Sequence, residues 1–181
     1  MGTIIALLYL KQAKLSCLTH SSACNLIGII YWERYEKLKD NKDLLMAQKY
    51  FDKAIEINSC HKESLLMRGA IHFHEAKLDD AILDFQKVVE YYPEHVSAHY
   101  NIASCKVGLG KFDEAIRYFE KAINFNMKRA EVAQFSIGYC YFIKKEMEHA
   151  KAYFNVALNN GYLEAEMYIK KIEEMEKYAG N

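Results

Sequence analysis

Apolar and small residues return along this chain at a nearly constant interval. One phrase occurs four times, as AQKYFDKAIEI, AILDFQKVVEY, AIRYFEKAINF and AKAYFNVALNN. The opening alanines are Ala47, Ala81, Ala115 and Ala150, spaced by 34, 34 and 35 residues, and a phenylalanine follows each of them four residues later. Self-similarity at a fixed period of this length predicts an array of helical units instead of one globular core.

A second helix is predicted upstream of each phrase. In the last three full units it carries a small residue twelve positions before the alanine, namely Gly69, Ala103 and Gly138. Small residues at that place let two antiparallel helices approach closely, and the phenylalanine fills the space against the next unit. Pro93 and Gly161 follow two of the phrases and mark turns between units.

This pattern resembles the tetratricopeptide repeat (TPR) family, whose units have a 34-residue period. The resemblance is best over residues 62–95 and 96–129, and residues 131–164 keep the small residue, the alanine and the phenylalanine. It departs from the family pattern at His99, where Trp is favoured, and at His72, where Tyr is favoured. The resemblance implies an all-α fold: a right-handed superhelix (α-solenoid) of antiparallel helix pairs, about ten helices in all, with a C-terminal capping helix.

We expect a single solenoid over residues 1–181. Nineteen residues separate Gly28 from Ala47 instead of twelve, so the first helix of this unit should extend to about Asp40, with a turn at 40–42. The predicted segments are a half-repeat helix at 3–18, a repeat with a lengthened first helix at 21–61, repeats at 62–95, 96–129 and 131–164, and a capping helix at 165–178.

Charge and composition exclude several classes of protein. The 24 basic and 24 acidic residues balance, so no global field attracts nucleic acid. The apolar run from Thr3 to Leu10 is too short to span a bilayer, and we expect no membrane insertion. The five cysteines are odd in number and follow no paired spacing, which predicts reduced thiols and a cytoplasmic location.

Residue patterns typical of catalysis or metal binding are missing from the sequence. It contains no phosphate-binding loop, dinucleotide fingerprint or nucleophile elbow. His72 and His74 lie about 200° apart around a helix, and Cys60 with His61 lacks a third ligand nearby in sequence. We therefore predict a non-enzyme with no catalytic residues, no metal site and no cofactor.

The resemblance places ligands on the concave face, which the first helix of each unit lines. Each predicted column follows the i, i+4, i+7 spacing of a single helix face. The predicted partner-binding residues are Asn25, Ile29, Trp32, Leu66, Ala70, Phe73, Tyr100, Ser104, Phe135, Tyr139 and Phe142, with Val107 completing the third column. Accessible aromatic surface of this kind commonly marks an interaction site. In the alternative interpretation, these residues pack against one another or against the N-terminal helix.

One binding mode of the family is disfavoured by the residues present. Some TPR domains hold the C-terminal carboxylate of chaperones with Lys, Arg and Asn side chains. At the matching positions stand Leu66, Ala70, Asn101, Val132 and Ser136, of which only Asn101 fits. Without cations there, a carboxylate would lose its water with little compensation. An apolar or amphipathic segment is the expected ligand.

The sequence thus predicts a non-catalytic protein–protein interaction module, an adaptor or a chaperone-like protein, whose groove holds a peptide or helix segment of another protein. A small secretion chaperone is the closest specific variant of this hypothesis. The alternative is a self-assembling structural scaffold, a homo-oligomer formed through the N-terminal helix and the groove. A nucleic-acid binder is disfavoured by the zero net charge.

Overall fold

The computed structural model describes residues 20–179, and every regular element within that range is an α-helix. The helices in chain order are α2 Ser21–Leu38, α3 Asn41–Ile57, α4 Lys62–His74, α5 Leu78–Tyr91, α6 Val96–Gly108, α7 Phe112–Asn124, α8 Ala130–Ile143, α9 Met147–Asn159 and α10 Ala165–Ala179. The predicted all-helical fold is therefore confirmed. The half-repeat helix predicted at 3–18 lies outside the described residues.

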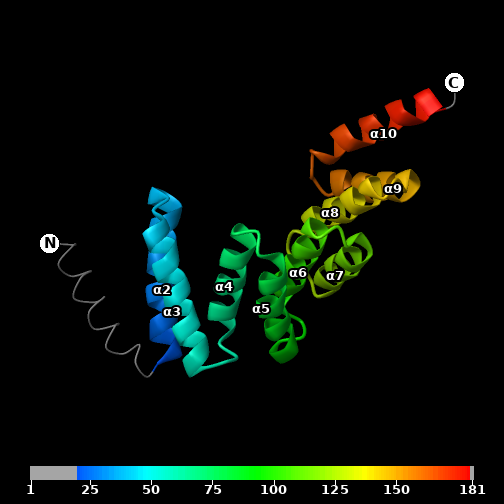
Figure 1. Ribbon diagram of the computed structural model, residues 1–181. Coiled ribbons are helices and arrows are strands. Elements are labelled where there is room, and N and C mark those ends of the chain that lie inside the picture. Colours follow the sequence, from blue (N-terminus) through cyan, green and yellow to red (C-terminus); the bar gives the residue numbers. More distant parts are fainter. Residues whose placement is uncertain (1–19, 180–181) are drawn as a thin grey trace. The chain divides into compact units, whose positions relative to one another are not determined.

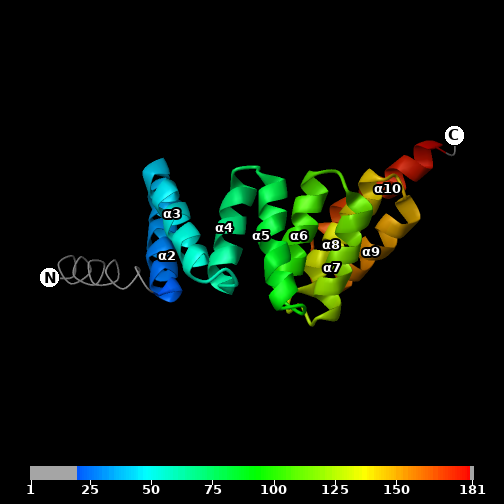
Figure 2. The same ribbon diagram turned by 60° about the horizontal axis from the view of Figure 1, so that its bottom comes forward.

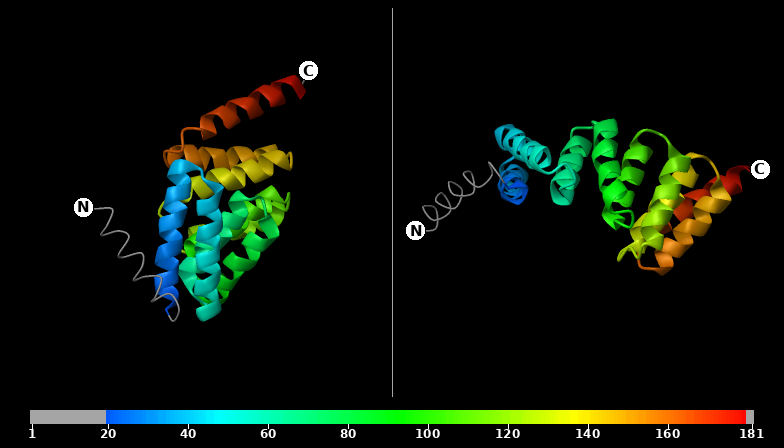
Figure 3. Two further views of the ribbon diagram at one scale, coloured as in Figure 1. Left: turned by 60° about the vertical axis from the view of Figure 1, so that its left-hand side comes forward. Right: turned by 90° about the horizontal axis from the view of Figure 1, so that it is seen from below.

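The chain forms two compact units, the first ending at Tyr91 and the second beginning at Tyr92. In the first unit α2 packs along α3 and α4 packs along α5 (Figure 1). In the second unit α6 pairs with α7, and α8 pairs with α9 (Figure 2). Helix α10 follows and lies next to α9 (Figure 3). One continuous solenoid over residues 1–181, with the repeat boundaries given above, stays a prediction.

A phenylalanine packs against a position with little or no side chain in each helix pair. A Cβ atom added to Gly28, Gly69 or Gly138 would stand 2.6, 2.7 or 2.8 Å from the nearest ring carbon of the facing phenylalanine. In the pair of α6 and α7, Ala103 shares a buried cluster with Phe119. The four rings are almost fully buried: Phe51, Phe85, Phe119 and Phe154. This position therefore sets how closely the two helices of a pair approach.

The turns within three of the helix pairs, α4–α5, α6–α7 and α8–α9, share one conformation. Ala76, Gly110 and Lys145 occupy equivalent positions and have φ angles of 58°, 71° and 62°. The following amide then donates to a carbonyl near the end of the first helix, as Lys111 N does to Lys106 O at 2.9 Å. Glycine adopts this left-handed conformation without cost, whereas alanine and lysine are strained in it.

One contact between paired helices differs in chemistry from one helix pair to the next. In the first pair Tyr31 stacks on Tyr50, with ring centroids 5.8 Å apart. In the next pair the same place is held by His72 and Asp84, whose Nδ1 and Oδ2 atoms are 3.3 Å apart. The buried Asp84 carboxylate also accepts from the Arg68 Nε–H at 2.9 Å. A buried carboxylate is stable only when a cation pairs with it. The contacts of Asp84 on α5 with Arg68 and His72 on α4 therefore link the two helices.

Helix α10 packs on the second unit through one apolar face. Ala165, Ile169 and Ile172 are buried in a cluster that includes residues of α9. On other sides of α10, Met167 and Tyr178 are exposed. The last helix of a repeat array needs a buried face that covers the apolar end of the array and an exposed face that contacts water.

Helix α2 has 18 residues, whereas α4 has 13. It ends at Leu38, and Lys39 turns the chain with a φ of 54°. Asp40 caps α3 by accepting a hydrogen bond from Lys42 N at 2.9 Å. The turn therefore comes slightly earlier than the predicted 40–42, because Asp40 belongs to the start of the next helix.

The cysteines differ in their states. Cys60, Cys105 and Cys140 are free thiols, whereas Cys24 is disulfide-bonded. The expectation of five reduced thiols is therefore wrong for Cys24, since an odd total does not prevent one cysteine from pairing. Burial raises the pKa of Cys105 and of Cys140 to about 11. These two thiols pack as small apolar side chains in α6 and α8.

Candidate binding surface

The groove residues predicted in the first unit lie on α2 and α4. Asn25 is 6% exposed and accepts a hydrogen bond from the Ser64 hydroxyl at 3.0 Å. A buried amide held in this way links α2 to α4 and is not available to a partner, so we leave Asn25 out of the proposed surface. Ile29 packs against a core cluster, while Leu66 and Ala70 are half-buried.

Two aromatic residues complete these first-unit columns. The Trp32 ring lies 5.6 Å from Tyr35 and 6.3 Å from His74 between centroids, so neighbouring rings cover part of it. Phe73 is 44% exposed and is the most accessible residue of the two columns. Among the predicted column residues of the first unit, Phe73 is therefore the one best placed to contact another molecule.

In the second unit the column on α8 meets α10. The Tyr168 ring centroid lies 5.4 Å from Phe135, 6.0 Å from Tyr139 and 5.5 Å from Phe142. The Lys171 ammonium also lies 5.4 Å from the centre of the Phe142 ring. All three column residues are half-buried, and the chain's own C-terminal helix covers part of each. Phe142, with two neighbours on α10, has less surface to offer a partner than the sequence suggested.

A hollow of about 160 Å³ lies between α6 and α8. Its lining contains four of the predicted column positions together with two neighbours: Ser104, Val107, Phe119, Phe135, Ser136 and Tyr139. The Ser104 and Ser136 hydroxyls donate to the backbone carbonyls of Tyr100 and Val132, at 3.0 and 2.8 Å. Because these hydroxyl donors are already paired and the rest of the lining is largely apolar, the hollow suits an apolar side chain.

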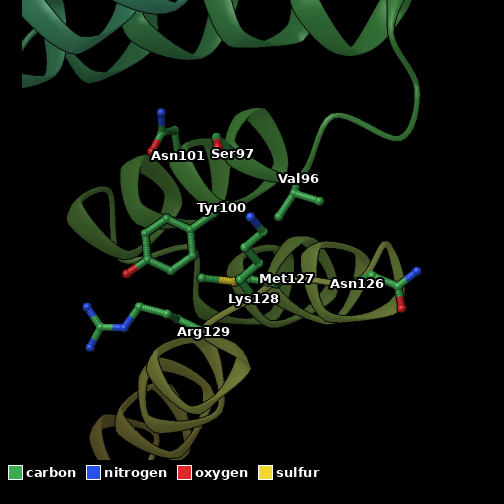
Figure 4. A pocket seen from close by; sticks show the side chains of 8 residues that line it. All are labelled: Val96, Ser97, Tyr100, Asn101, Asn126, Met127, Lys128 and Arg129. Atoms are coloured by element: carbon green, nitrogen blue, oxygen red, sulfur yellow. The ribbon is translucent and has the colours of Figure 1, made fainter.

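A larger hollow of about 480 Å³ lies beside the first turns of α6 (Figure 4). One side comes from α6 and the other from the connection between α7 and α8. The lining residues are Val96, Ser97, Tyr100, Asn101, Asn126, Met127, Lys128 and Arg129. Tyr100 was predicted as a column residue, and Ser104 of the smaller hollow lies one helical turn further along the same face. The two hollows therefore follow one another along α6.

Local structure fixes both sides of the larger hollow. The α6 side begins at a capped helix end, where Ala98 N donates to His95 Nδ1 at 3.2 Å. On the other side, Asn126 has a φ of 63°, and Met127 N donates to Ala122 O at 3.2 Å. This turn ends α7 and directs the chain across the hollow before α8 begins.

Tyr162, between α9 and α10, packs against Phe135, which lines the smaller hollow. Its ring centroid lies 4.6 Å from that of Phe135, and its hydroxyl donates to Glu164 Oε2 at 3.0 Å. Burial raises the pKa of the Tyr162 phenol, and the hydrogen bond to Glu164 raises it further. The phenol therefore stays protonated at neutral pH and retains its hydrogen bond.

The part of the larger hollow that comes from the connection between α7 and α8 was not predicted from the sequence. Helix-face periodicity selects residues on helices, so it passed over residues 126–129. The signal that was available is the pair Lys128–Arg129, which follows Asn126 at a repeat boundary. Asn101 was considered only as one member of a carboxylate clamp.

Residues 20–179 contain neither a metal-binding cluster nor a membrane-spanning helix. No group of three or more His, Cys, Asp or Glu is arranged there to hold a metal ion. His72 pairs with Asp84, and the His74 ring packs edge-on against Tyr35 with centroids 5.6 Å apart. In the same span, no helix has both the length and the apolar content to cross a bilayer.

Two family models match the chain. The model described as "Anaphase-promoting complex, cyclosome, subunit 3" matches residues 40–122, and the model described as "Tetratricopeptide repeat" matches residues 106–162. Among curated proteins, the protein CTR9 homolog of Arabidopsis thaliana is 21% identical over 117 residues, and tetratricopeptide repeat protein 14 of Mus musculus is 31% identical over 87. These alignments cover 65% and 44% of this chain but only 11% of each relative, so the chain spans about a tenth of their length.

Solved structures share the fold. A crystal structure of MamA is 21% identical, has a TM-score of 0.72 and matches over 87% of both chains. PilF of Pseudomonas aeruginosa is 16% identical, has a TM-score of 0.70, and matches over 94% of this chain and 80% of its own. The paired helices, the repeat period and the family models agree: the chain belongs to the tetratricopeptide repeat family.

Proposed function

We propose that the second unit binds an apolar or amphipathic segment of another protein along α6 and α8. Tetratricopeptide repeat proteins are generally non-catalytic modules for interaction with other proteins. The proposal that the segment lies along α6 and α8 rests on one observation: two hollows follow one another along one face of α6. Pockets with apolar linings and a few polar groups are the usual form of a ligand site.

The residues available for contact are a subset of the predicted columns. Tyr100 lines the larger hollow, and Ser104, Val107, Phe135 and Tyr139 line the smaller one. Half-buried aromatic residues can gain further burial against a ligand without unfolding of the helices that carry them. In the first unit, Ile29, Trp32, Leu66, Ala70 and Phe73 stay predicted partner-binding residues of that unit.

The biological role that fits this proposal is an adaptor or chaperone-like protein. Such a protein shields an apolar segment of its partner until the partner reaches its own assembly. A cytoplasmic location belongs to the same proposal: the free thiols of Cys60, Cys105 and Cys140 support it, whereas the disulfide-bonded Cys24 does not. Cell fractionation with an antibody against the chain tests the location.

The binding proposal is tested by selecting displayed random dodecapeptides on the purified chain and on two variants. Val107→Asp places a charge in the smaller hollow, and the matched control Val156→Asp places the same charge on α9, where Val156 is 44% exposed. The chain and the Val156→Asp control should enrich the same peptides. Val107→Asp should enrich none.

A second variant distinguishes loss of the binding surface from misfolding of Val107→Asp. Ser104→Leu fills the smaller hollow with an apolar group and adds no buried charge. It should lose the peptides while its melting temperature stays within a few degrees of the parent. Retention of the same peptides by both Ser104→Leu and Val107→Asp would show that they bind elsewhere. Light scattering decides the self-assembly alternative: a concentration-dependent mass that Val107→Asp abolishes would replace the adaptor by a homo-oligomer.

A further inference from the structure

The larger hollow differs in charge from the smaller one. Two consecutive cations, Lys128 and Arg129, stand on one side, and the Asn101 amide and Ser97 hydroxyl stand on α6 (Figure 4). None of the eight residues that line it is acidic. The apolar part of the lining consists of Val96, Met127 and the Tyr100 ring. The hollow therefore combines positive charge with apolar surface.

These polar groups make few contacts with other residues of the described range 20–179. Arg129 forms an ion pair with Glu131, in which its Nε–H donates to Oε1 at 3.2 Å; this contact occupies one of the five N–H donors of the guanidinium. Over residues 20–179, neither the Lys128 ammonium nor the Asn101 side chain has a hydrogen-bond or ion-pair partner. The Lys128 ammonium and the remaining Arg129 donors are thus available to an anionic group. A carboxylate is the anionic group of unmodified protein side chains, and it pairs with a guanidinium or with an ammonium.

The spacing of the two hollows adds a geometric constraint. On α6, Ser97 and Asn101 line the larger hollow, called the charged hollow below, and Ser104 and Val107 line the smaller one, called the apolar hollow. These pairs are six to seven residues apart, which is about 10 Å along a helix that rises 1.5 Å per residue. An extended segment covers that distance in about three residues, and a helical segment covers it in about seven.

We propose that the partner segment carries an Asp or Glu side chain that binds at Lys128 and Arg129, and that a Leu, Ile or Phe about 10 Å away fills the apolar hollow. The acidic group is assigned to a side chain within the segment, and the experiment below distinguishes it from the carboxylate at a chain end. This inference rests on the proposed function and specifies the chemistry of its ligand. The charged hollow sets the direction in which the segment lies.

The test uses the same display library, in which every peptide is joined to the phage coat through its C-terminus and has no free carboxylate there. Selection is repeated on Lys128→Glu/Arg129→Glu. The matched control Arg117→Glu/Lys121→Glu makes the same change in net charge at two exposed positions of α7. Circular dichroism shows whether both double variants keep the parent's helical content and melting temperature.

Peptides from the parent and from the α7 control should share an acidic residue three or seven positions from a large apolar one. Peptides from Lys128→Glu/Arg129→Glu should replace the acid by Lys or Arg. Changing the acid of one selected peptide to its amide should weaken its Kd for the parent about three- to tenfold, with a smaller effect at 0.5 M NaCl.

Three outcomes overturn parts of the account separately. If parent-selected peptides show an apolar preference without an acidic one, or if the acid persists on Lys128→Glu/Arg129→Glu, the charge inference is wrong while the binding face stands. If free-acid peptides bind and their amidated forms do not, the carboxylate comes from a chain end and the inference also fails. If the parent enriches no peptide at all, the proposed function itself fails.

Discussion

Replacing Gly69 by alanine should destabilise the first unit, although alanine is the better helix former. The added Cβ would lie 2.7 Å from Cε1, 2.9 Å from Cζ and 3.0 Å from Cδ1 of Phe85. Ordinary contacts begin near 3.4 Å, so α4 or the ring must move by about 0.7 Å. Phe85 is 1% exposed, and its ring has no outward position to adopt.

The magnitude follows from two opposing contributions. Alanine in place of glycine contributes about 1 kcal/mol of helix propensity. Overpacking a well-filled core costs about 1–3 kcal/mol, and contacts with three ring carbons indicate the upper end of that range. We expect a net loss of about 1–2 kcal/mol, which in a chain of this size lowers Tm by roughly 2–8 °C.

Thermal and urea unfolding followed by circular dichroism measure this effect for Gly69→Ala, Phe85→Leu and the double variant. Leucine removes the ring edge, so the double variant should be more stable than the sum of the single changes by about 1 kcal/mol. Ala103→Gly is the matched control, since alanine is native at this place in α6, and it should lose about 1 kcal/mol. A higher Tm for Gly69→Ala, or strict additivity, would refute the close approach of the two helices.

Three further predictions test the turns, a thiol and the terminal helix. Ala76→Gly relieves a left-handed φ and should raise the unfolding free energy by about 0.5–1 kcal/mol, whereas Gly110→Ala at the equivalent turn should lower it by about 1 kcal/mol. In urea melts, a less stable Ala76→Gly or a more stable Gly110→Ala would contradict this. Cys140 should resist iodoacetamide at pH 8 while Cys60 reacts. Its raised pKa also means that its contribution to stability is complete below pH 9 and is lost as the pH rises through about 11, so Cys140→Ala should flatten the fall in Tm over that range. Tyr168→Ala removes ring contacts with α8 and should cost about 2–4 kcal/mol, with faster hydrogen exchange in α10; unchanged exchange would contradict this.

The spacing of residues was sufficient to predict the helix pairs. Gly69 and Phe85 stand at fixed positions in a repeat, and a 34-residue period leaves few ways to pack them. The turns were predicted less well, because Ala76 and Lys145 carry no glycine signal although they adopt the same φ as Gly110. Local sequence does not reveal a strained conformation that the packing of neighbouring helices imposes.

The candidate site was only partly accessible to the same reasoning. Periodicity placed Tyr100 and Ser104 on one helix face, and each lines a hollow there; that they bind a partner stays a prediction. It misplaced Asn25, since a polar residue on a predicted groove face turned out to be buried in a bond to Ser64. It also missed residues 126–129, because a connection has no period and its position depends on how α7 ends.

The most direct test of the account is an NMR titration of the ¹⁵N-labelled chain with a peptide selected from the display library. Amide shift changes should concentrate in α6, in residues 126–129 and on the α6-facing side of α8, and they should disappear in Val107→Asp. Saturable shift changes centred on α7 and the exposed side of α9, with α6 unaffected, would contradict it.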